Sequence, residues 1–181
     1  SKEPIQMSDL LYNRPNFLDS YTNKPKNKSR KEWVREKLLN ESEEKDIHGA
    51  EAASKAKIRT RHLPISEFSQ DPDATQIHHI FPRHDFKDIC YYKENLIALT
   101  PTEHLVKAHP NNNTSKIDKH FQIELLSCKL DSILHSYEED DGFYSLQDFI
   151  KVLNIGYDLE LPYDCEITGL RKILEQKAKN I

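Results

Sequence analysis

The sequence of 181 residues is poor in glycine and cysteine and has no long apolar run. Only four glycines are present, which argues against a turn-dense β-sandwich or barrel and favours helices. Three cysteines lie far apart without a CxxC pair, which argues against a disulfide framework and a four-cysteine zinc site. No segment has the roughly 18 apolar residues that a membrane-spanning helix needs. We therefore expect a cytoplasmic protein with reduced thiols and no membrane partner.

The excess of charge of one sign is also small, because the net charge of the whole chain is only −4. The net charge of the protein therefore does not by itself attract nucleic acid. Basic residues nevertheless gather at 24–37, with seven Lys or Arg and two Glu, and again at 55–62. Two interpretations stay open: an ordinary solvated surface, or a basic face that contacts backbone phosphates without reading base sequence.

The pattern of apolar residues predicts a mostly helical α+β protein, with two short antiparallel strands and a helix embedded among other helices. We divide the chain into four parts: an irregular N-terminal arm at 1–28, a helical and partly basic region at 29–75, a strand–loop–strand–helix segment at 76–114, and a helical C-terminal part at 115–181. Outside the third part, we expect helices at 30–45, 49–62, 117–137, 145–153 and 166–179.

The third part contains QIHHIF at 76–81, expected as the first strand, and NLIAL at 95–99, expected as the second. Thr100 or Thr102 can cap a helix that follows to about residue 109. Neighbouring side chains on a strand point to opposite faces. His78 and His79 should therefore face two different environments.

Two neighbouring imidazoles with separate surroundings suit the hydrolysis of a phosphodiester. A bound cation can polarise the phosphoryl oxygen and stabilise the leaving oxygen. A separate neutral imidazole can take a proton from water near neutral pH. In such a unit His78 and His104 can gather on a metal ion, while His79 is left for the proton.

Three short stretches, HHIFP, ENLIALTP and EHLVKAH, together resemble the His-Asn-His (HNH, ββα-metal) nuclease motif. The gap of eight residues between Asn95 and His104 matches that motif. The resemblance implies a metal-dependent endonuclease in which His79 is the general base and His78 and His104 bind the metal ion. It further implies that Asn95 orients the base or braces the loop. In some members of the family the residue at this position binds the metal ion instead.

Three more residues are candidates for phosphate or substrate contacts: Arg83, Lys107 and His109. Nucleases of the colicin type carry another helical histidine four positions after the first, where this chain has Ala108. A shift of one residue turns a side chain by about 100° on an α-helix. We therefore expect His109 to contact phosphate rather than to bind the metal ion.

The resemblance implies one divalent cation, Mg²⁺ or Mn²⁺, whereas histidine ligands suit Zn²⁺ or Ni²⁺ better than Mg²⁺. The resemblance also implies DNA as the substrate. The residues around the motif resemble those of restriction and anti-phage defence enzymes. The alternatives are a non-specific or toxin-type nuclease and a non-catalytic, zinc-stabilised module that binds DNA or protein. The C-terminal helices are candidate surfaces for a homo-oligomer or for a separate recognition or ATPase partner.

Overall fold

The computed structural model describes residues 25, 27–109 and 117–181. The predicted arm at 1–28 lies outside the described residues except for residues 25, 27 and 28, and so does the end of the strand–loop–strand–helix segment at 110–114. The described chain divides into two units at residue 46: the described residues up to 46 form one unit, and those of 47–181 form the other. The predicted fold class is confirmed: the protein is mostly helical, with a two-stranded antiparallel hairpin.

The first helix, α3, runs from Arg30 to His62 without interruption. We expected two helices here, at 30–45 and 49–62, and that prediction is wrong. The only helix-weakening residue at the expected break is Gly49, and one glycine inside a helix costs only about 1 kcal/mol relative to alanine. Ser29 and Glu32 form a capping box at the start, because Ser29 Oγ accepts from Glu32 N at 3.3 Å and Glu32 Oε2 accepts from Ser29 N at 3.1 Å.

The hairpin consists of β1, Gln76–His79, and β2, Leu96–Leu99, which pair antiparallel with His78 opposite Ile97 and His79 opposite Leu96. Two short 3₁₀ turns, Lys87–Ile89 and Lys93–Asn95, lie in the connection between them. Every residue of β2 is buried, so both faces of this strand are covered. A π-helix, Glu103–Ala108, follows β2.

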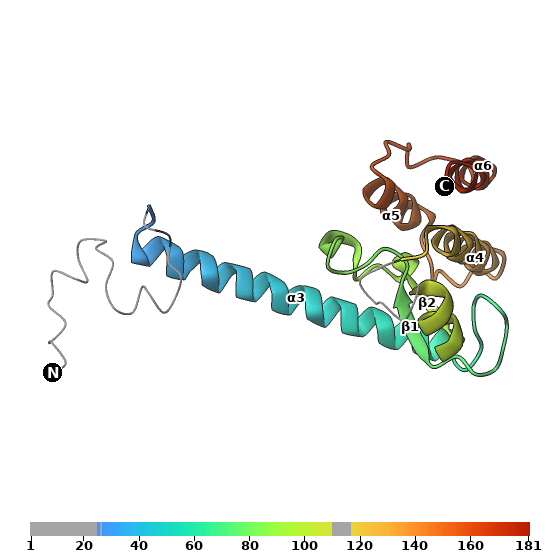
Figure 1. Cartoon of the computed structure of the whole chain (residues 1–181), viewed down its shortest axis with the longest axis horizontal. Coiled ribbons are helices and arrows are strands. Elements are labelled where there is room, and N and C mark those ends of the chain that lie inside the picture. The colour runs from blue at the N-terminus through green and yellow to red at the C-terminus, as the bar shows by residue number, and fades with distance from the viewer. Residues whose placement is uncertain (1–24, 26, 110–116) are drawn as a thin grey trace, which may run out of the picture. The chain divides into compact units, whose positions relative to one another are not determined.

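Three α-helices complete the unit 47–181: α4, Lys119–Glu138; α5, Leu146–Tyr157; and α6, Ile167–Lys179 (Figure 1). They match the three predicted C-terminal helices, with α5 extending further than expected. Helix α4 packs against α6 and the π-helix, while α5 packs against the second 3₁₀ turn. Among the described residues, no helix combines the length and the hydropathy that crossing a bilayer requires.

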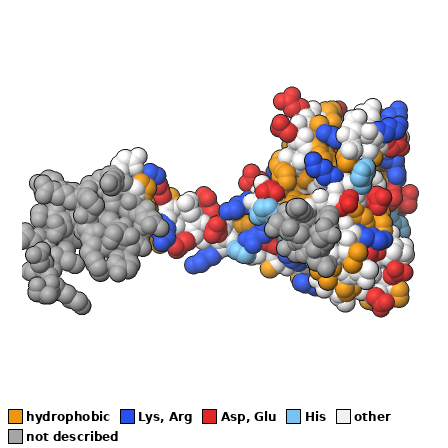
Figure 2. Space-filling view, in the orientation of Figure 1, with side chains coloured by type: hydrophobic (Ala, Val, Ile, Leu, Met, Phe, Trp, Pro, Cys, Tyr) orange, Lys and Arg blue, Asp and Glu red, His pale blue; other side chains and the backbone are white. Residues whose placement is uncertain are grey.

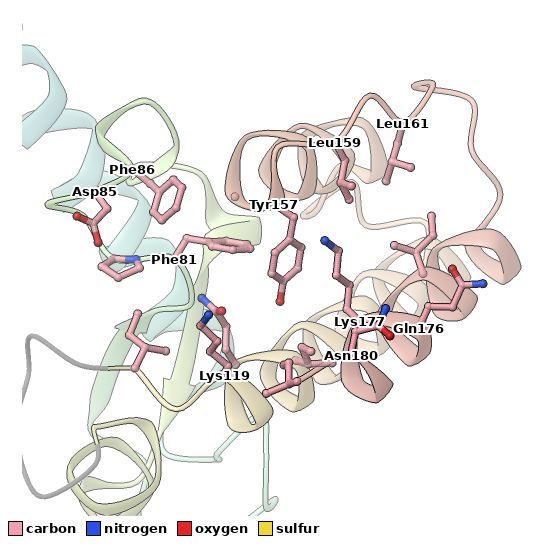
Figure 3. A pocket seen from close by; sticks show the side chains of 17 residues that line it. Phe81, Asp85, Phe86, Lys119, Tyr157, Leu159, Leu161, Gln176, Lys177 and Asn180 are labelled. Atoms are coloured by element: carbon pink, nitrogen blue, oxygen red, sulfur yellow. The ribbon is translucent and has the colours of Figure 1, made fainter.

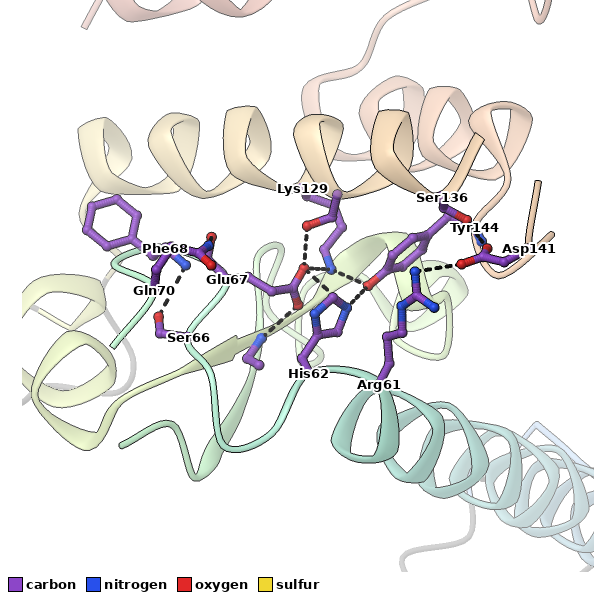
Figure 4. A network of polar contacts seen from close by, with 12 residues as sticks. Arg61, His62, Ser66, Glu67, Phe68, Gln70, Lys129, Ser136, Asp141 and Tyr144 are labelled. Carbon is purple, nitrogen blue, oxygen red and sulfur yellow. Dashed lines mark hydrogen bonds and ion pairs between the residues drawn. The ribbon is translucent and has the colours of Figure 1, made fainter. Parts of the chain in front are cut away.

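A buried polar network joins α4 to the rest of this unit (Figure 4). Lys129 is fully buried, and its Nζ lies 2.5 Å from Glu67 Oε2. The other carboxylate oxygen of Glu67 accepts from the backbone N of Ala98 at 3.0 Å. Burial disfavours both charges, but the ammonium of Lys129 keeps the pKa of Glu67 below its usual range. The pair therefore connects the 63–75 segment, β2 and α4 through one carboxylate.

Tyr144 and His62 extend the network. Lys129 Nζ donates to Tyr144 Oη at 2.8 Å, so the tyrosine O–H is available for His62 Nε2, which lies 2.7 Å away. Accepting this hydrogen bond requires a neutral imidazole. Burial, the largest cause, and the charges of Lys129 and Arg61 lower the pKa of His62 to about 4, against the opposing charge of Glu67.

We predict that Lys129→Met lowers the free energy of unfolding by about 3–5 kcal/mol, because it leaves the carboxylate of Glu67 buried without its partner. Urea unfolding at neutral pH measures this loss. Adding Glu67→Gln to the variant should restore part of it, and Lys172→Met, at an exposed lysine of α6, should change stability by less than about 0.5 kcal/mol. A Lys129→Met protein as stable as the wild type would contradict this account of the network.

We also predict a loss of stability as the pH falls from about 6.5 to about 4. In this window the unfolded chain binds a proton at His62 that the folded protein excludes, because its pKa is lowered to about 4. Urea midpoints at pH 7.5 and pH 4.5 should differ less in His62→Gln, which keeps a hydrogen-bonding side chain but does not titrate. Equal differences in the two metal-free proteins would show that His62 contributes nothing to the acid sensitivity.

Candidate metal centre and adjoining histidine

Three histidines come together beside the hairpin: His78 of β1, His104 of the π-helix, and His109 directly after it. One nitrogen from each ring lies within 4.8 Å of the others, and the ring centroids are 5.0–5.2 Å apart. His78 and His109 are buried and His104 is half-buried. This group, which we call the histidine triad, could hold a metal ion.

The backbone after β2 differs from the α-helix on which the expectation for His109 rested. The π-helix ends at Ala108, and His109 follows it with extended backbone, φ −120° and ψ 92°. The turn of about 100° per residue of an α-helix therefore does not apply to His109. This residue, expected as a phosphate contact, lies among the candidate metal ligands.

The turn that presents His104 is held by a capping box. Glu103 Oε2 accepts from the backbone N of Thr100 at 2.8 Å, and Thr100 Oγ1 accepts from the backbone N of Glu103 at 3.2 Å. Ser66 Oγ donates to the same Glu103 oxygen at 2.7 Å. The prediction that Thr100 or Thr102 caps this helix is thus confirmed for Thr100.

The triad meets the chemical requirements of a metal site. Burial, with the neighbouring histidines as a second cause, lowers the pKa of His78 to about 3, and burial also lowers the pKa of His104. The lone pairs of these imidazoles are therefore available without the loss of a proton. Ligand nitrogens in a tetrahedral zinc site lie about 3.4 Å apart, so small side-chain rotations would bring the triad to ligand spacing.

His79 has different surroundings, as expected for the next residue of a strand. Its Nε2 lies 3.3 Å from Oε1 of Glu51, a buried side chain on α3. Burial, followed by the charge of Lys55, lowers the pKa of His79 to about 4, while Glu51 and a hydrogen bond to the Cys90 backbone oppose the shift. At neutral pH His79 is therefore uncharged.

Glu51 holds a compact group of charges around His79. Its Oε1 lies 2.6 Å from Lys55 Nζ, and its Oε2 lies 3.0 Å from Arg83 Nε. Arg83 also contacts His48, which lies on α3 as Glu51 does: Nη2 of Arg83 is 2.7 Å from Nε2 of His48. Burial alone would raise the pKa of Glu51, but the hydrogen bond and charge of Lys55, aided by His79 and Arg83, lower it. Glu51 is thus an anion that positions Arg83 and His79.

Sequence reasoning did not find Glu51. The pair Glu51–Lys55 has the i,i+4 spacing of an ordinary helical ion pair, which is indistinguishable in the sequence from a solvated one. Only the packing of α3 against the hairpin reveals that this carboxylate is buried beside His79.

Asn95 faces the loop rather than the triad. Its Oδ1 accepts from the backbone N of Phe81 at 2.8 Å, and its Nδ2 donates to the carbonyls of Phe81 at 3.0 Å and Ile89 at 3.2 Å. The side chain is fully buried, so its hydrogen bonds join both ends of the connection between β1 and β2. Because Cys90 follows Ile89, Asn95 also helps to place the backbone group that hydrogen-bonds His79.

A cleft of about 320 Å³ connects the two histidine environments. The triad, His79 and Arg83 all line it, together with His84. Lys107 does not: its Nζ lies over the ring of Phe68, 4.7 Å from the centroid. The structure therefore gathers five of the seven predicted site residues around one cleft, with Asn95 behind it and Lys107 elsewhere.

Several side chains of the two basic stretches, for which a solvated surface and a basic face were both open, are paired with acidic residues. Lys28 Nζ lies 2.6 Å from Glu36, and Arg61 lies within 3 Å of both Glu139 and Asp141. On the side of the unit 47–181 seen in Figure 2, Lys and Arg side chains alternate with Asp and Glu. The described residues thus offer mixed charge on this side rather than one broad positive surface.

Comparison of the chain with family models, with curated proteins and with solved structures finds no match. The arguments for function therefore rest on the residues and their geometry.

We predict that the triad binds a transition-metal ion and that His109 is one of its ligands. His109→Ala should weaken the binding of Zn²⁺ or Ni²⁺ by at least about tenfold, as His78→Ala and His104→Ala should, because each removes one nitrogen ligand. Competition with a chromophoric chelator measures these affinities. His120→Ala, at an exposed histidine of α4, is the matched control and should bind metal as the wild type does. Undiminished binding by His109→Ala would contradict its assignment as a ligand.

Proposed function

We propose that this protein is a metal-dependent endonuclease that hydrolyses phosphodiester bonds of DNA. One observation carries the proposal: three imidazoles that can hold a metal ion share a cleft with a fourth, separately held imidazole, His79. Hydrolysis of a phosphodiester needs these two functions at neighbouring positions. Three of these four histidines, His78, His79 and His104, also carry the resemblance to the HNH motif.

In this proposal the triad supplies the metal site, and a bound cation would neutralise charge on the scissile phosphate and its leaving oxygen. His79 acts as the general base for the attacking water. Its pKa of about 4 in the protein alone is low for this task, but a phosphate anion in the cleft would raise it. Glu51 and the backbone of Cys90 hold the ring, and Arg83 offers a cation at the mouth of the same cleft.

The ligand set bears on the identity of the metal ion. Three imidazoles are the protein ligands of one class of catalytic zinc site, and imidazole suits Ni²⁺ as well. Mg²⁺ prefers oxygen ligands, and none of the three triad side chains supplies one. We therefore favour a transition metal over Mg²⁺ as the activating ion.

The proposed biological role is restriction or anti-phage defence, which rests on the resemblance of the motif alone. A second candidate function is that of a non-catalytic, zinc-stabilised binding module. The observation in its favour is the burial of His78 and His109, which also suits a structural metal site. The role of His79 separates the two candidates, because a structural site does not need a base outside the ligand set.

We predict that the wild type cuts plasmid DNA with at least one of Mn²⁺, Ni²⁺, Zn²⁺ and Mg²⁺, and that His79→Ala lowers the rate by about 10²–10⁴-fold, the usual contribution of a general base. Gel analysis of supercoiled plasmid measures the rate. Metal affinity should be unchanged, since His79 is not in the triad, and the variant should still unfold cooperatively on heating.

The matched control is His135→Ala, at an exposed histidine on α4, which should cut at the wild-type rate. No cleavage of modified or unmodified DNA by the wild type with any of the four ions would contradict the nuclease proposal. If the protein unfolds when metal is removed and His79→Ala binds DNA with wild-type affinity, the zinc-stabilised module would be supported instead.

A further inference from the structure

A second and larger cavity, of about 710 Å³, adjoins the histidine cleft. Its walls come from the loop after β1, the start of α4, the end of α5, and α6 (Figure 3). Its volume falls within the range of roughly 300–1,000 Å³ that is usual for small-molecule sites. No part of the proposed hydrolysis uses this cavity.

Aromatic rings form one side of the cavity. The Phe81 centroid lies 5.4 Å from that of Phe86 and 5.1 Å from that of Tyr157, both in edge-to-face geometry. Phe81 is fixed between them because Gly156 leaves it room: a Cβ at residue 156 would lie 2.3 Å from the Phe81 ring. A rigid set of rings at the wall of a cavity offers stacking surfaces to a planar ligand.

Polar groups are available beside these rings. Among the residues that the structure describes, the buried hydroxyl of Tyr157 has no hydrogen-bond partner, which is unusual for such a group. Burial raises its pKa to about 12, so it remains a donor. Lys177 Nζ lies 4.8 Å from the Tyr157 centroid, and Lys119 also lines the cavity. The acidic lining residue, Asp85, lies 3.0 Å from His84 Nε2.

The cavity lies next to the proposed catalytic cleft. Pro82 and Ile117 line both. Phe81 follows His79 by two residues, so the loop after β1 lines both spaces: Pro82 and Arg83 line the cleft, and Phe81 and Phe86 line the cavity. A nucleic-acid strand whose phosphate lies at the triad can therefore carry a neighbouring nucleotide into the cavity.

We propose that this cavity binds one unpaired nucleobase of the strand whose phosphodiester lies in the histidine cleft. The base stacks on the ring of Tyr157, the tyrosine hydroxyl donates to the adjoining sugar–phosphate backbone, and Lys177 and Lys119 neutralise its phosphates. This inference rests on the proposed nuclease function and extends it: the substrate is single-stranded DNA, or duplex DNA with a base turned out of the helix. Rings with lysines fit this ligand because bases stack on aromatic side chains while cations follow the backbone.

Binding of single-stranded oligodeoxynucleotides to the full chain in EDTA tests the inference. One oligonucleotide carries a central 2-aminopurine, whose fluorescence reports stacking, and its partner carries an abasic site at the same position. The wild type should bind the first more tightly and quench its fluorescence. Tyr157→Leu should weaken that binding by roughly five- to a hundredfold and abolish the quenching, as expected for the loss of one stacking contact.

Other variants separate the stacking from the charge. Tyr157→Phe keeps the ring and should retain the quenching with a smaller loss of affinity. Lys177→Gln should weaken binding and reduce its dependence on salt concentration, by a slope of about 0.7 for one phosphate contact on a single strand. Tyr163→Leu and Lys172→Gln, at exposed residues outside this cavity, are the matched controls and should bind as the wild type does.

Equal affinity for the abasic and base-containing oligonucleotides would overturn the proposal. So would unchanged quenching by a folded Tyr157→Leu protein, or, if that variant is unfolded, a Lys177→Gln protein with wild-type affinity and salt dependence. Such a result would indicate that the cavity binds a protein segment instead of a nucleobase. Because binding is measured without metal, a failure of the nuclease proposal is distinguishable: it would appear as absent cleavage, with base binding intact.

Discussion

The ion pair between Glu67 and Lys129 is the interaction on which the arrangement of the 47–181 unit depends. Each charge alone would be strongly unfavourable in the interior, so the elements that carry them must stay together. The carboxylate also accepts from β2 through the Ala98 backbone, and the ammonium also donates to Tyr144 after α4. The position of the hairpin relative to α4 is thereby set, and with it the position of β1 and its two histidines.

A second constraint places the chemistry on this frame. The alternation of side chains along a strand sends His78 and His79 to opposite faces of β1, one toward the π-helix and the other toward Glu51 on α3. Asn95 uses both ends of its amide to brace the loop between the strands. That loop holds the backbone beside His79, supplies Arg83 to the cleft, and carries Phe81 into the larger cavity. One buried amide therefore supports both the proposed catalytic centre and the proposed base-binding cavity.

The electrostatic design of the cleft follows from burial. All three triad members lie close together, and desolvation keeps His78 and His104 neutral and able to bind a cation. Around His79, a buried carboxylate is balanced by Lys55 and Arg83, so the site carries positive charge near a position suited to phosphate. On the side of the unit 47–181 seen in Figure 2, the described residues mix positive and negative side chains. The positive charge beside His79 therefore belongs to the cleft itself.

The sequence by itself determined the helical fold class, the two strands, the C-terminal helices and the candidate roles of His78, His79, Asn95 and His104, because these follow from local periodicity and from a compact motif. Tertiary structure decided the rest. The helix after β2 is a π-helix that ends before His109, and the extended backbone of His109 leaves it in the triad; no short-range pattern in the sequence distinguished this helix from an α-helix. Glu51 lies 27 or more residues before the hairpin histidines, and its burial beside His79 depends on packing between distant segments, as does the aromatic cavity built from Phe81, Tyr157 and Lys177.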